Sequence, residues 1–252
     1  MNGTGNTILV TGSTSGIGLG LALRLHKAGN KVIVAGRRKE ILDRIVSEHP
    51  DIDSVVLDVS SPQSIQQATD ALASSHPDLN VLINSAGIMQ WEDLTDPAYL
   101  GTAEDIVTTN LLGTIRMVYA LTPRLLKQPH ATIINVSSAL AFVPLPATAT
   151  YSATKAAVHS FTQSLRVQLA DSSVEVIELA PPGVRTSLLG QENDERAMPL
   201  EAFLDEIFGL LEIKPTPSEL VVERARGLRF AEANGSFDEV LTMLAGIKPH
   251  AE

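Results

Sequence analysis

A tyrosine and a lysine stand four residues apart in the segment Tyr151-Ser-Ala-Thr-Lys155. On a helix, such residues share one face and lie about 6 Å apart along the axis. A free phenol has a pKa of about 10 and exchanges protons slowly near neutral pH, but a nearby ammonium favours the phenolate and lowers that pKa. The pair indicates acid–base chemistry on a substrate oxygen, although the same spacing also occurs by chance on solvated helix faces.

A serine that could assist this chemistry precedes the tyrosine by thirteen residues. Ser138 follows the apolar run Thr132–Val136, which predicts a strand. Doubly wound sheets bind their ligands at the carboxyl ends of strands. A side chain placed there is expected to lie beside a bound ligand.

A glycine-rich turn near the N-terminus predicts a nucleotide site. Gly12-Ser-Thr-Ser-Gly16-Ile-Gly18 lies between the strand-like run Thr7–Val10 and the amphipathic segment Leu19–Ala28. Glycines let the backbone approach a pyrophosphate, and a helix N-terminus offers free N–H donors and positive potential. The spacing differs from the usual GxGxxG and lacks the Lys-Ser/Thr of a P-loop, so a plain tight turn is the alternative interpretation.

Residues at the end of the second predicted strand bear on the choice of dinucleotide. Gly36 stands where NAD sites usually carry an acidic residue, and Arg37 and Arg38 follow it. Because guanidinium groups suit the 2′-phosphate of NADP, we expect NADP(H), with Arg37 as the main contact and Arg38 assisting. The alternative is a solvated arginine pair. Asp58, after the third predicted strand, either accepts a hydrogen bond from the adenine amine or caps a turn.

Apolar β-type runs alternate with segments of helical spacing along the chain. This alternation predicts an α/β fold with a doubly wound, Rossmann-type parallel sheet covered on both faces. No repeat or linker interrupts the pattern, so residues 1–252 are expected to form one domain. Residues 185–217 mix apolar side chains with acidic residues and three prolines. They predict either a flap over the substrate or a short helix packed on the core.

Composition excludes several classes of protein. The chain is 44% apolar and carries a net charge of −10, which favours a compact globule and argues against a nucleic-acid surface. It has no cysteine, which excludes disulfides, thiolate catalysis and cysteine-ligated zinc. The N-terminus does not resemble a signal peptide, and no apolar stretch reaches about eighteen residues. We therefore expect a cytoplasmic protein without a membrane partner.

Taken together, the motifs resemble those of the short-chain dehydrogenase/reductase family. The matching pieces occur in the family's order between residue 7 and about residue 186: TGSTSGIG at 11–18, Asp58-Val59, Asn84-Ser-Ala-Gly87, Asn110, Ser138, Tyr151 with Lys155, and Pro182-Gly183-Val-Arg-Thr186. The resemblance implies an NADP(H)-dependent oxidoreductase that transfers a hydride between nicotinamide and a carbonyl or alcohol carbon. It also implies a small-molecule substrate and a homo-oligomer, either a dimer or a tetramer.

The resemblance assigns roles to the matching residues. Tyr151 would donate a proton to the carbonyl oxygen, Ser138 would hydrogen-bond that oxygen, and Lys155 would hold the nicotinamide ribose and lower the tyrosine pKa. Asn110 would anchor a water in a proton relay. The implied cofactor site comprises Gly12, Ser15, Gly16, Ile17, Gly18, Arg37, Arg38, Asp58, Val59, Asn84, Ala86, Gly87, Tyr151, Lys155, Pro182, Gly183, Val184 and Thr186.

Two departures from the family pattern point to a subgroup. Ser85 replaces the second asparagine of the usual NNAG, and the C-terminus lacks the frequent glycine-rich ending. Leu220-Val-Val-Glu-Arg-Ala-Arg226 and a helical stretch near Phe237–Leu244 stand there instead. With Glu178-Leu-Ala-Pro-Pro182, these features resemble the DltE-like oxidoreductases.

Other functional classes fit the sequence less well. There is no GxSxG elbow and no HExxH, so neither a serine hydrolase nor a metal site is expected. The main alternative is a non-catalytic NADP(H)-binding regulator on the same fold. Retention of the acid–base residues favours catalysis. Mostly apolar residues after the motifs predict a largely apolar ketone or secondary alcohol as substrate: Ile88, Gln90, Trp91, Leu140, Phe142, Val143, Leu145, Leu188 and Leu189.

Overall fold

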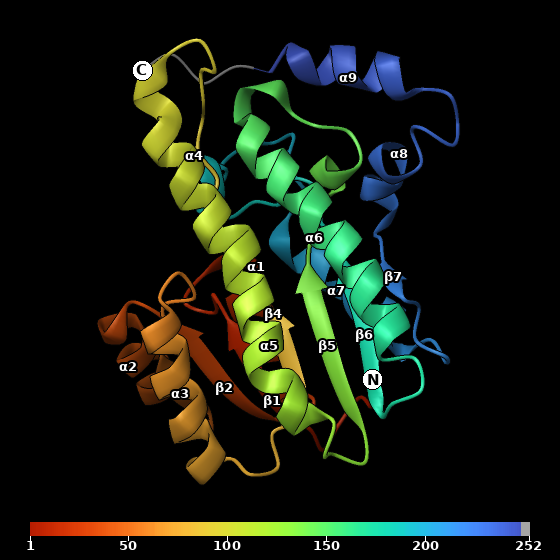
Figure 1. Ribbon diagram of the computed structural model, residues 1–252. Helices are drawn as coiled ribbons and strands as arrows, with labels where there is room; N and C mark the ends of the chain where they lie inside the picture. The colour runs from red at the N-terminus through yellow and green to blue at the C-terminus, as the bar shows by residue number, and fades with distance from the viewer. Residues whose placement is uncertain (248–252) are drawn as a thin grey trace.

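Seven parallel strands form one sheet in the computed structural model, which describes residues 1–247 (Figure 1). The spatial order is β3-β2-β1-β4-β5-β6-β7. Most of the strands are largely apolar runs, whereas the edge strands β3 and β7 are short and partly exposed: β1 (Thr7–Thr11), β2 (Lys31–Gly36), β3 (Asp53–Val56), β4 (Val81–Asn84), β5 (Ala131–Val136), β6 (Val174–Leu179) and β7 (Glu219–Leu220). The predicted doubly wound fold is confirmed, and the predicted strands Thr7–Val10 and Thr132–Val136 each differ from the observed ones by one residue.

Helices cover both faces of the sheet because alternate strand residues point to opposite sides. Ile8 and Val10 pack with α1 (Gly16–Lys27), α2 (Lys39–Glu48) and α7 (Leu200–Glu212). Leu9, between them, packs on the other face with three further helices: α3 (Pro62–Ser75), α5 (Gly113–Leu125) and α6 (Ala149–Gln168). Strands buried on both sides explain why these runs are continuously apolar.

The strand order reverses between β1 and β4, which lie side by side in the sheet. The chain winds outward from β1 to β3 in one direction and from β4 to β7 in the other. The two connections diverge at this point, so the carboxyl ends of β1 and β4 border a crevice suited to a ligand. The glycine-rich turn follows β1 and the segment 84–87 follows β4.

The chain after β6 divides into an exposed segment and a packed helix. Val184 forms an isolated bridge to Met198, which closes the loop between them. In α7, Phe203 and Leu204 are fully buried, and α7 contacts α1. Arg24 of α1 pairs with two acidic side chains of α7, at 2.5 and 2.6 Å. Within the segment 185–217, α7 is therefore part of the packed core layer.

The C-terminal part adds two short helices beside the carboxyl end of the sheet. α8 (Arg226–Arg229) follows β7, and α9 (Phe237–Ala245) runs above the ends of the strands (Figure 1). Leu244 of α9 belongs to a small apolar cluster with Val143 and Leu145. Within residues 1–247, no helix is both long and apolar enough to cross a membrane.

Candidate active site

The glycine-rich turn packs so closely that side chains are excluded from it. Gly12 has a φ of +67°, and a Cβ there would lie 2.6 Å from the Cα of Ala86, which follows β4. A Cβ on Gly18 would lie 2.5 Å from the carbonyl oxygen of Gly12. Ser15 is extended and directly precedes α1, whose first turn holds Ile17 and free N–H groups. The turn forms a cradle for an anion at the crevice between β1 and β4.

The loop after β6 reaches the same turn. Gly16, with a φ of +57°, lies against Thr186, whose side chain would be 3.3 Å from an added Cβ. Val184, two residues before Thr186, is buried, whereas Pro182 and Gly183 are partly or fully exposed. The structure therefore brings the predicted residues 182–186 next to the glycine-rich turn, although they lie far away in the sequence.

Arg38, not Arg37, contacts the glycine-rich turn. Its guanidinium donates to Thr14 Oγ1 at 2.7 Å and to Ser15 Oγ at 3.4 Å. Both arginines are exposed. Gly36 lies under Thr14, since an added Cβ would be 2.7 Å from Thr14 Cγ2. The Arg38 guanidinium beside the turn can bind an anionic group. The sequence had favoured Arg37 as the main contact of the 2′-phosphate.

Asp58 and Val59 border the crevice from the end of β3. Asp58 Oδ1 accepts hydrogen bonds from the backbone N–H of Ser60 at 2.9 Å and from its hydroxyl at 2.6 Å. This is the turn-capping arrangement that the sequence left open. Val59 is buried and packs against Gly113, where an added Cβ would lie 2.8 Å from Val59 Cγ2.

The segment after β4 presents one unsatisfied polar atom. Asn84 is buried, and its amide donates to Asn135 Oδ1 at 2.9 Å. Among the described residues, no partner lies within hydrogen-bond distance of Asn84 Oδ1. Ala86 N–H is held by Thr11 Oγ1 at 3.2 Å. A buried acceptor without a partner is costly, so Asn84 Oδ1 is suited to a donor supplied by a water or ligand.

Asn110 lies in a π-helical turn, Val107–Leu112, between α4 (Leu100–Ile106) and α5. Its side chain is fully buried and exchanges two 2.8 Å hydrogen bonds with the backbone of Ile88. The main-chain carbonyl of Asn110 accepts a hydrogen bond from Thr114 Oγ1 at 2.9 Å. π-turns inside helices often occur at functional sites. An added Cβ on Gly87 would lie 3.3 Å from Asn110 Oδ1 and 3.8 Å from Lys155 Nζ, so these three residues are close together.

Tyr151 and Lys155 lie on α6 as predicted, and both are buried. Lys155 Nζ is 5.6 Å from the centroid of the Tyr151 ring and donates to the carbonyl of Val136 at 2.8 Å. Ser138, just after β5, hydrogen-bonds Tyr151 and caps the N–H of Leu140 at 3.1 Å. The structure therefore brings the proposed proton donor, its ammonium neighbour and the proposed carbonyl donor into one group.

Burial controls the electrostatics of this group. It raises the pKa of the Tyr151 phenol to about 12, and the hydrogen bond with Ser138 only partly opposes that effect. The sequence had predicted a lowered tyrosine pKa, and in this structure the direction is reversed. Burial also lowers the pKa of Lys155 to about 8, against the charge of Glu178. At neutral pH, the phenol is protonated and the lysine is mostly charged, which suits a proton donor beside a cation.

The family profile of short chain dehydrogenases matches residues 6–197, more than half of the chain. The chain belongs to the short chain dehydrogenase family. The glycine-rich turn, the group around Tyr151 and the strands β1 to β6 all lie within the matched residues. The resemblance predicted from the motifs is thus confirmed.

Similar proteins place the chain within this family. An uncharacterized oxidoreductase, DltE of Bacillus subtilis, is 39% identical over 92% of this chain and 93% of its own length, which confirms the DltE-like subgroup. A short chain dehydrogenase from Burkholderia cenocepacia, crystallised with NADP, is 26% identical over 98% of this chain and all of its own, with a TM-score of 0.83. A 3-ketoacyl-(acyl-carrier-protein) reductase from Brucella melitensis, crystallised with NADH, is 27% identical over 85% of this chain and 93% of its own, with a TM-score of 0.74.

The sequence interpretation missed several supports of this dehydrogenase site. Glu92 binds the N-terminus of α6, where its carboxylate accepts from Thr150 N at 3.0 Å and Thr150 Oγ1 at 2.5 Å. This carboxylate fixes the helix one residue before Tyr151 and interacts favourably with the helix dipole. No motif signals it, because Glu92 lies 58 residues before its partner. Glu178 and His159 were missed for the same reason.

Proposed function

We propose that this protein is an NADP(H)-dependent oxidoreductase that interconverts a largely apolar ketone and the corresponding secondary alcohol. The observation that carries the proposal is the buried group of Ser138, Tyr151 and Lys155 beside the glycine-rich turn. A buried phenol with a serine donor and an ammonium neighbour is suited to protonating a carbonyl oxygen. The NADP complex of the Burkholderia relative supports the choice of cofactor.

The residues present fit a dinucleotide. Gly12 and Gly18 let the turn pack tightly against Ala86 and against itself directly before α1, whose first-turn N–H groups are free to bind a phosphate group. The unpartnered Asn84 Oδ1 and the Arg38 guanidinium offer an acceptor and a cationic donor at the same crevice. We propose that the cofactor residues expected from the sequence hold NADP(H) here.

In the proposed reaction, each residue has a separate task. When bound, the cofactor supplies a hydride, so that a ketone, NADPH and a proton give a secondary alcohol and NADP⁺. Tyr151 donates its phenolic proton to the carbonyl oxygen, and the Ser138 hydroxyl stabilises the charge that develops on that oxygen. The Lys155 ammonium favours the phenolate that remains, and Asn110 anchors a water in the relay that returns a proton to Tyr151.

A largely buried apolar cluster that follows Ser138 in the sequence supports an apolar substrate. Val143 and Leu145 follow Ser138 and form a cluster with residues of the N-terminal half and of α9. Trp91 packs on this cluster from the segment after β4. An apolar wall next to a single polar reaction centre selects for a ketone with bulky apolar groups.

A non-catalytic NADP(H)-binding regulator on the same fold is the competing function. Such a protein would bind the cofactor without needing a proton donor. Incubation with NADPH and a mixed panel of aliphatic and aromatic ketones distinguishes the two. Oxidation of NADPH that depends on both ketone and protein supports the oxidoreductase, and tight NADPH binding without turnover supports the regulator.

We expect a preference for NADPH over NADH of tenfold or more in kcat/KM. One charge-assisted hydrogen bond is worth about 1.5–3 kcal/mol, and about 1.4 kcal/mol corresponds to a factor of ten. Because Arg38 donates hydrogen bonds to Thr14 and Ser15 of the glycine-rich turn and Arg37 does not, Arg38→Ala should remove most of this preference and Arg37→Ala less. The kcat/KM with each cofactor is measured for the wild type and both variants.

A substitution at Gly36 that is designed to favour NADH needs a second, compensating substitution. Gly36→Asp would introduce the carboxylate typical of NAD sites, but its Cβ would meet Thr14 Cγ2 at 2.7 Å. The double variant Thr14→Ser/Gly36→Asp removes that methyl group and should shift the preference toward NADH. Equal use of both cofactors by the wild type would contradict this prediction and leave the arginines as solvated surface.

We propose that residues 185–198 act as a flap over the bound cofactor and substrate. Leu189 has a φ of +57°, a left-handed conformation that costs a non-glycine residue about 1–3 kcal/mol and is typical of functional loops. α7 serves as the internal control because Phe203 and Leu204 are buried. Hydrogen exchange should slow in 185–198 but not in 200–212 when NADP⁺ is added. Unchanged exchange across 185–198 would favour a statically packed loop.

We further propose a cytoplasmic homo-oligomer that acts on small molecules. Large apolar side chains are exposed along the helical rod formed by α4, the π-turn and α5: Leu100, Leu112, Tyr119 and Leu126. An exposed apolar stripe of this kind is suited to contact with a second copy. Sedimentation equilibrium measures whether the protein is a dimer or a tetramer.

A further inference from the structure

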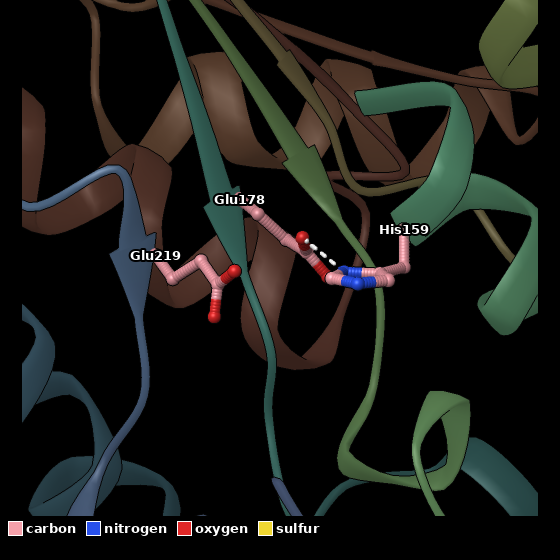
Figure 2. Close-up of side chains that lie close together, drawn as sticks. All are labelled: His159, Glu178 and Glu219. Carbon is pink, nitrogen blue, oxygen red and sulfur yellow. Dashed lines mark hydrogen bonds and ion pairs between the residues drawn. The ribbon is translucent and has the colours of Figure 1, made fainter. Parts of the chain in front are cut away.

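A cluster of charged side chains lies behind the proposed site, where β6 and β7 run side by side (Figure 2). Glu178 of β6 is fully buried, and Figure 2 shows its carboxylate directed at His159 of α6. One carboxylate oxygen accepts from Ser137 Oγ at 2.5 Å, and the other lies 2.7 Å from His159 Nδ1. A buried carboxylate held in this way keeps a fixed position.

The cluster is better explained as a charge network than as a cation site. The ligating atoms of His159, Glu178 and Glu219 lie within 4.8 Å of one another. However, Arg229 binds Glu219 through two hydrogen bonds, at 2.8 and 3.2 Å, and its guanidinium also lies 4.4 Å from the Phe142 ring centroid. The cation that this cluster needs is therefore already provided by the chain itself.

The network is linked to Lys155 by two elements. Tyr151, Lys155 and His159 follow one another at four-residue intervals on α6 and share one face. On β5 and the residue after it, the Val136 carbonyl accepts from Lys155 Nζ, and Ser137 donates to Glu178. Burial lowers the pKa of Lys155 to about 8, and the charge of Glu178 opposes that effect.

We propose that Glu178 is a positioning residue of the reaction, whose buried carboxylate, held by Ser137 and His159, keeps the Lys155 ammonium charged beside Tyr151. This inference rests on the proposed function, because it assumes that Lys155 assists the tyrosine. The other titratable groups around Glu178 are on α6, β7 and α8: Tyr151, Lys155, His159, Glu219 and Arg229. Glu219 is neutralised by Arg229, so Glu178 supplies the negative charge that acts on Lys155.

The charge state of Lys155 tests the proposal without any turnover. NMR of protein labelled with ¹³C at the lysine ε-carbon follows the titration of each lysine, and Lys155→Met identifies its signal by loss. We expect Lys155 to titrate near pH 8 in the wild type and at a lower pH in Glu178→Gln. Glutamine can keep both contacts, since its oxygen accepts from Ser137 and its amide donates to the other tautomer of His159.

A matched variant separates charge from structure. His159→Gln removes one contact of Glu178 but retains the carboxylate, so the Lys155 midpoint should not fall below the wild-type value. If Glu178 had only a structural role, Glu178→Gln and His159→Gln would shift the Lys155 midpoint equally. An unchanged Lys155 midpoint in Glu178→Gln would overturn the proposal. If Glu178→Gln does not fold, Glu178→Asp takes its place: it retains the charge but withdraws the carboxylate by one methylene group towards β6, so the Lys155 midpoint must still fall.

The pH profile of carbonyl reduction connects the network with the reaction. As pH rises through about 8, Lys155 loses its proton, so the wild-type kcat/KM should fall. In Glu178→Gln, this fall should move to lower pH by the same interval as the NMR midpoint. A shifted midpoint with an unshifted profile would overturn the positioning role. Absence of ketone reduction by the wild type would contradict the proposed function, while the NMR titration would still decide the contact between Glu178 and Lys155.

Discussion

Replacing Tyr151 by phenylalanine is expected to lower kcat for ketone reduction by about 10²–10⁴-fold, the range typical of a lost general acid. The phenol is buried, and its pKa is raised to about 12, so it carries its proton at every pH at which the enzyme would work. Phenylalanine fills the same space but has no proton to give. Stopped-flow measurement of NADPH oxidation at saturating ketone follows the chemical step directly.

Two further measurements make this test specific. NADPH affinity, measured by fluorescence titration, should change by less than a few fold, since the ring remains in place. Tyr99→Phe is the matched control because Tyr99 is 38% exposed and lies outside the proposed site, and this variant should behave as the wild type. A loss of less than tenfold in Tyr151→Phe would be incompatible with Tyr151 as the proton donor.

Replacing Ser138 by alanine should cost about 2.7–4 kcal/mol in the barrier, or about 10²–10³-fold in kcat, as for other oxyanion donors. Ser138 hydrogen-bonds Tyr151 and stands at the carboxyl end of β5, where the carbonyl oxygen of a substrate would need a donor. Its loss leaves the developing charge with one donor fewer. The kcat of ketone reduction measures the effect.

Ser138 also has a structural role that must be separated from catalysis. Its hydroxyl caps the N–H of Leu140 at 3.1 Å, and a lost cap costs about 0.5–2 kcal/mol of stability. A moderate fall in Tm is therefore expected together with the fall in kcat. Ser138→Thr keeps a hydroxyl and should recover part of the rate. If Ser138→Ala lowers Tm but leaves kcat within a few fold, Ser138 acts only as the cap.

Local sequence patterns were sufficient to predict the strands, the helix and the turn that carry the site. Continuous apolar runs predicted the strands because both faces of a parallel sheet are buried, and the four-residue spacing of Tyr151 and Lys155 predicted a shared helix face. The glycines predicted a close turn between β1 and α1, since only a residue without a Cβ fits there. Each of these inferences depends on neighbours within about one turn of helix or one strand, which the sequence displays directly.

The tertiary structure decided what depends on distant partners. The lowered tyrosine pKa expected from Lys155 was wrong in direction, because desolvation depends on everything packed around the phenol. Arg38 rather than Arg37 reaches the glycine-rich turn, a choice that two adjacent arginines do not reveal in the sequence. Glu178 meets His159 across 19 residues only when β6 and α6 are packed together. Periodicity encodes which face of an element is buried, whereas the partners of a buried charge are fixed only by the packing of elements against one another.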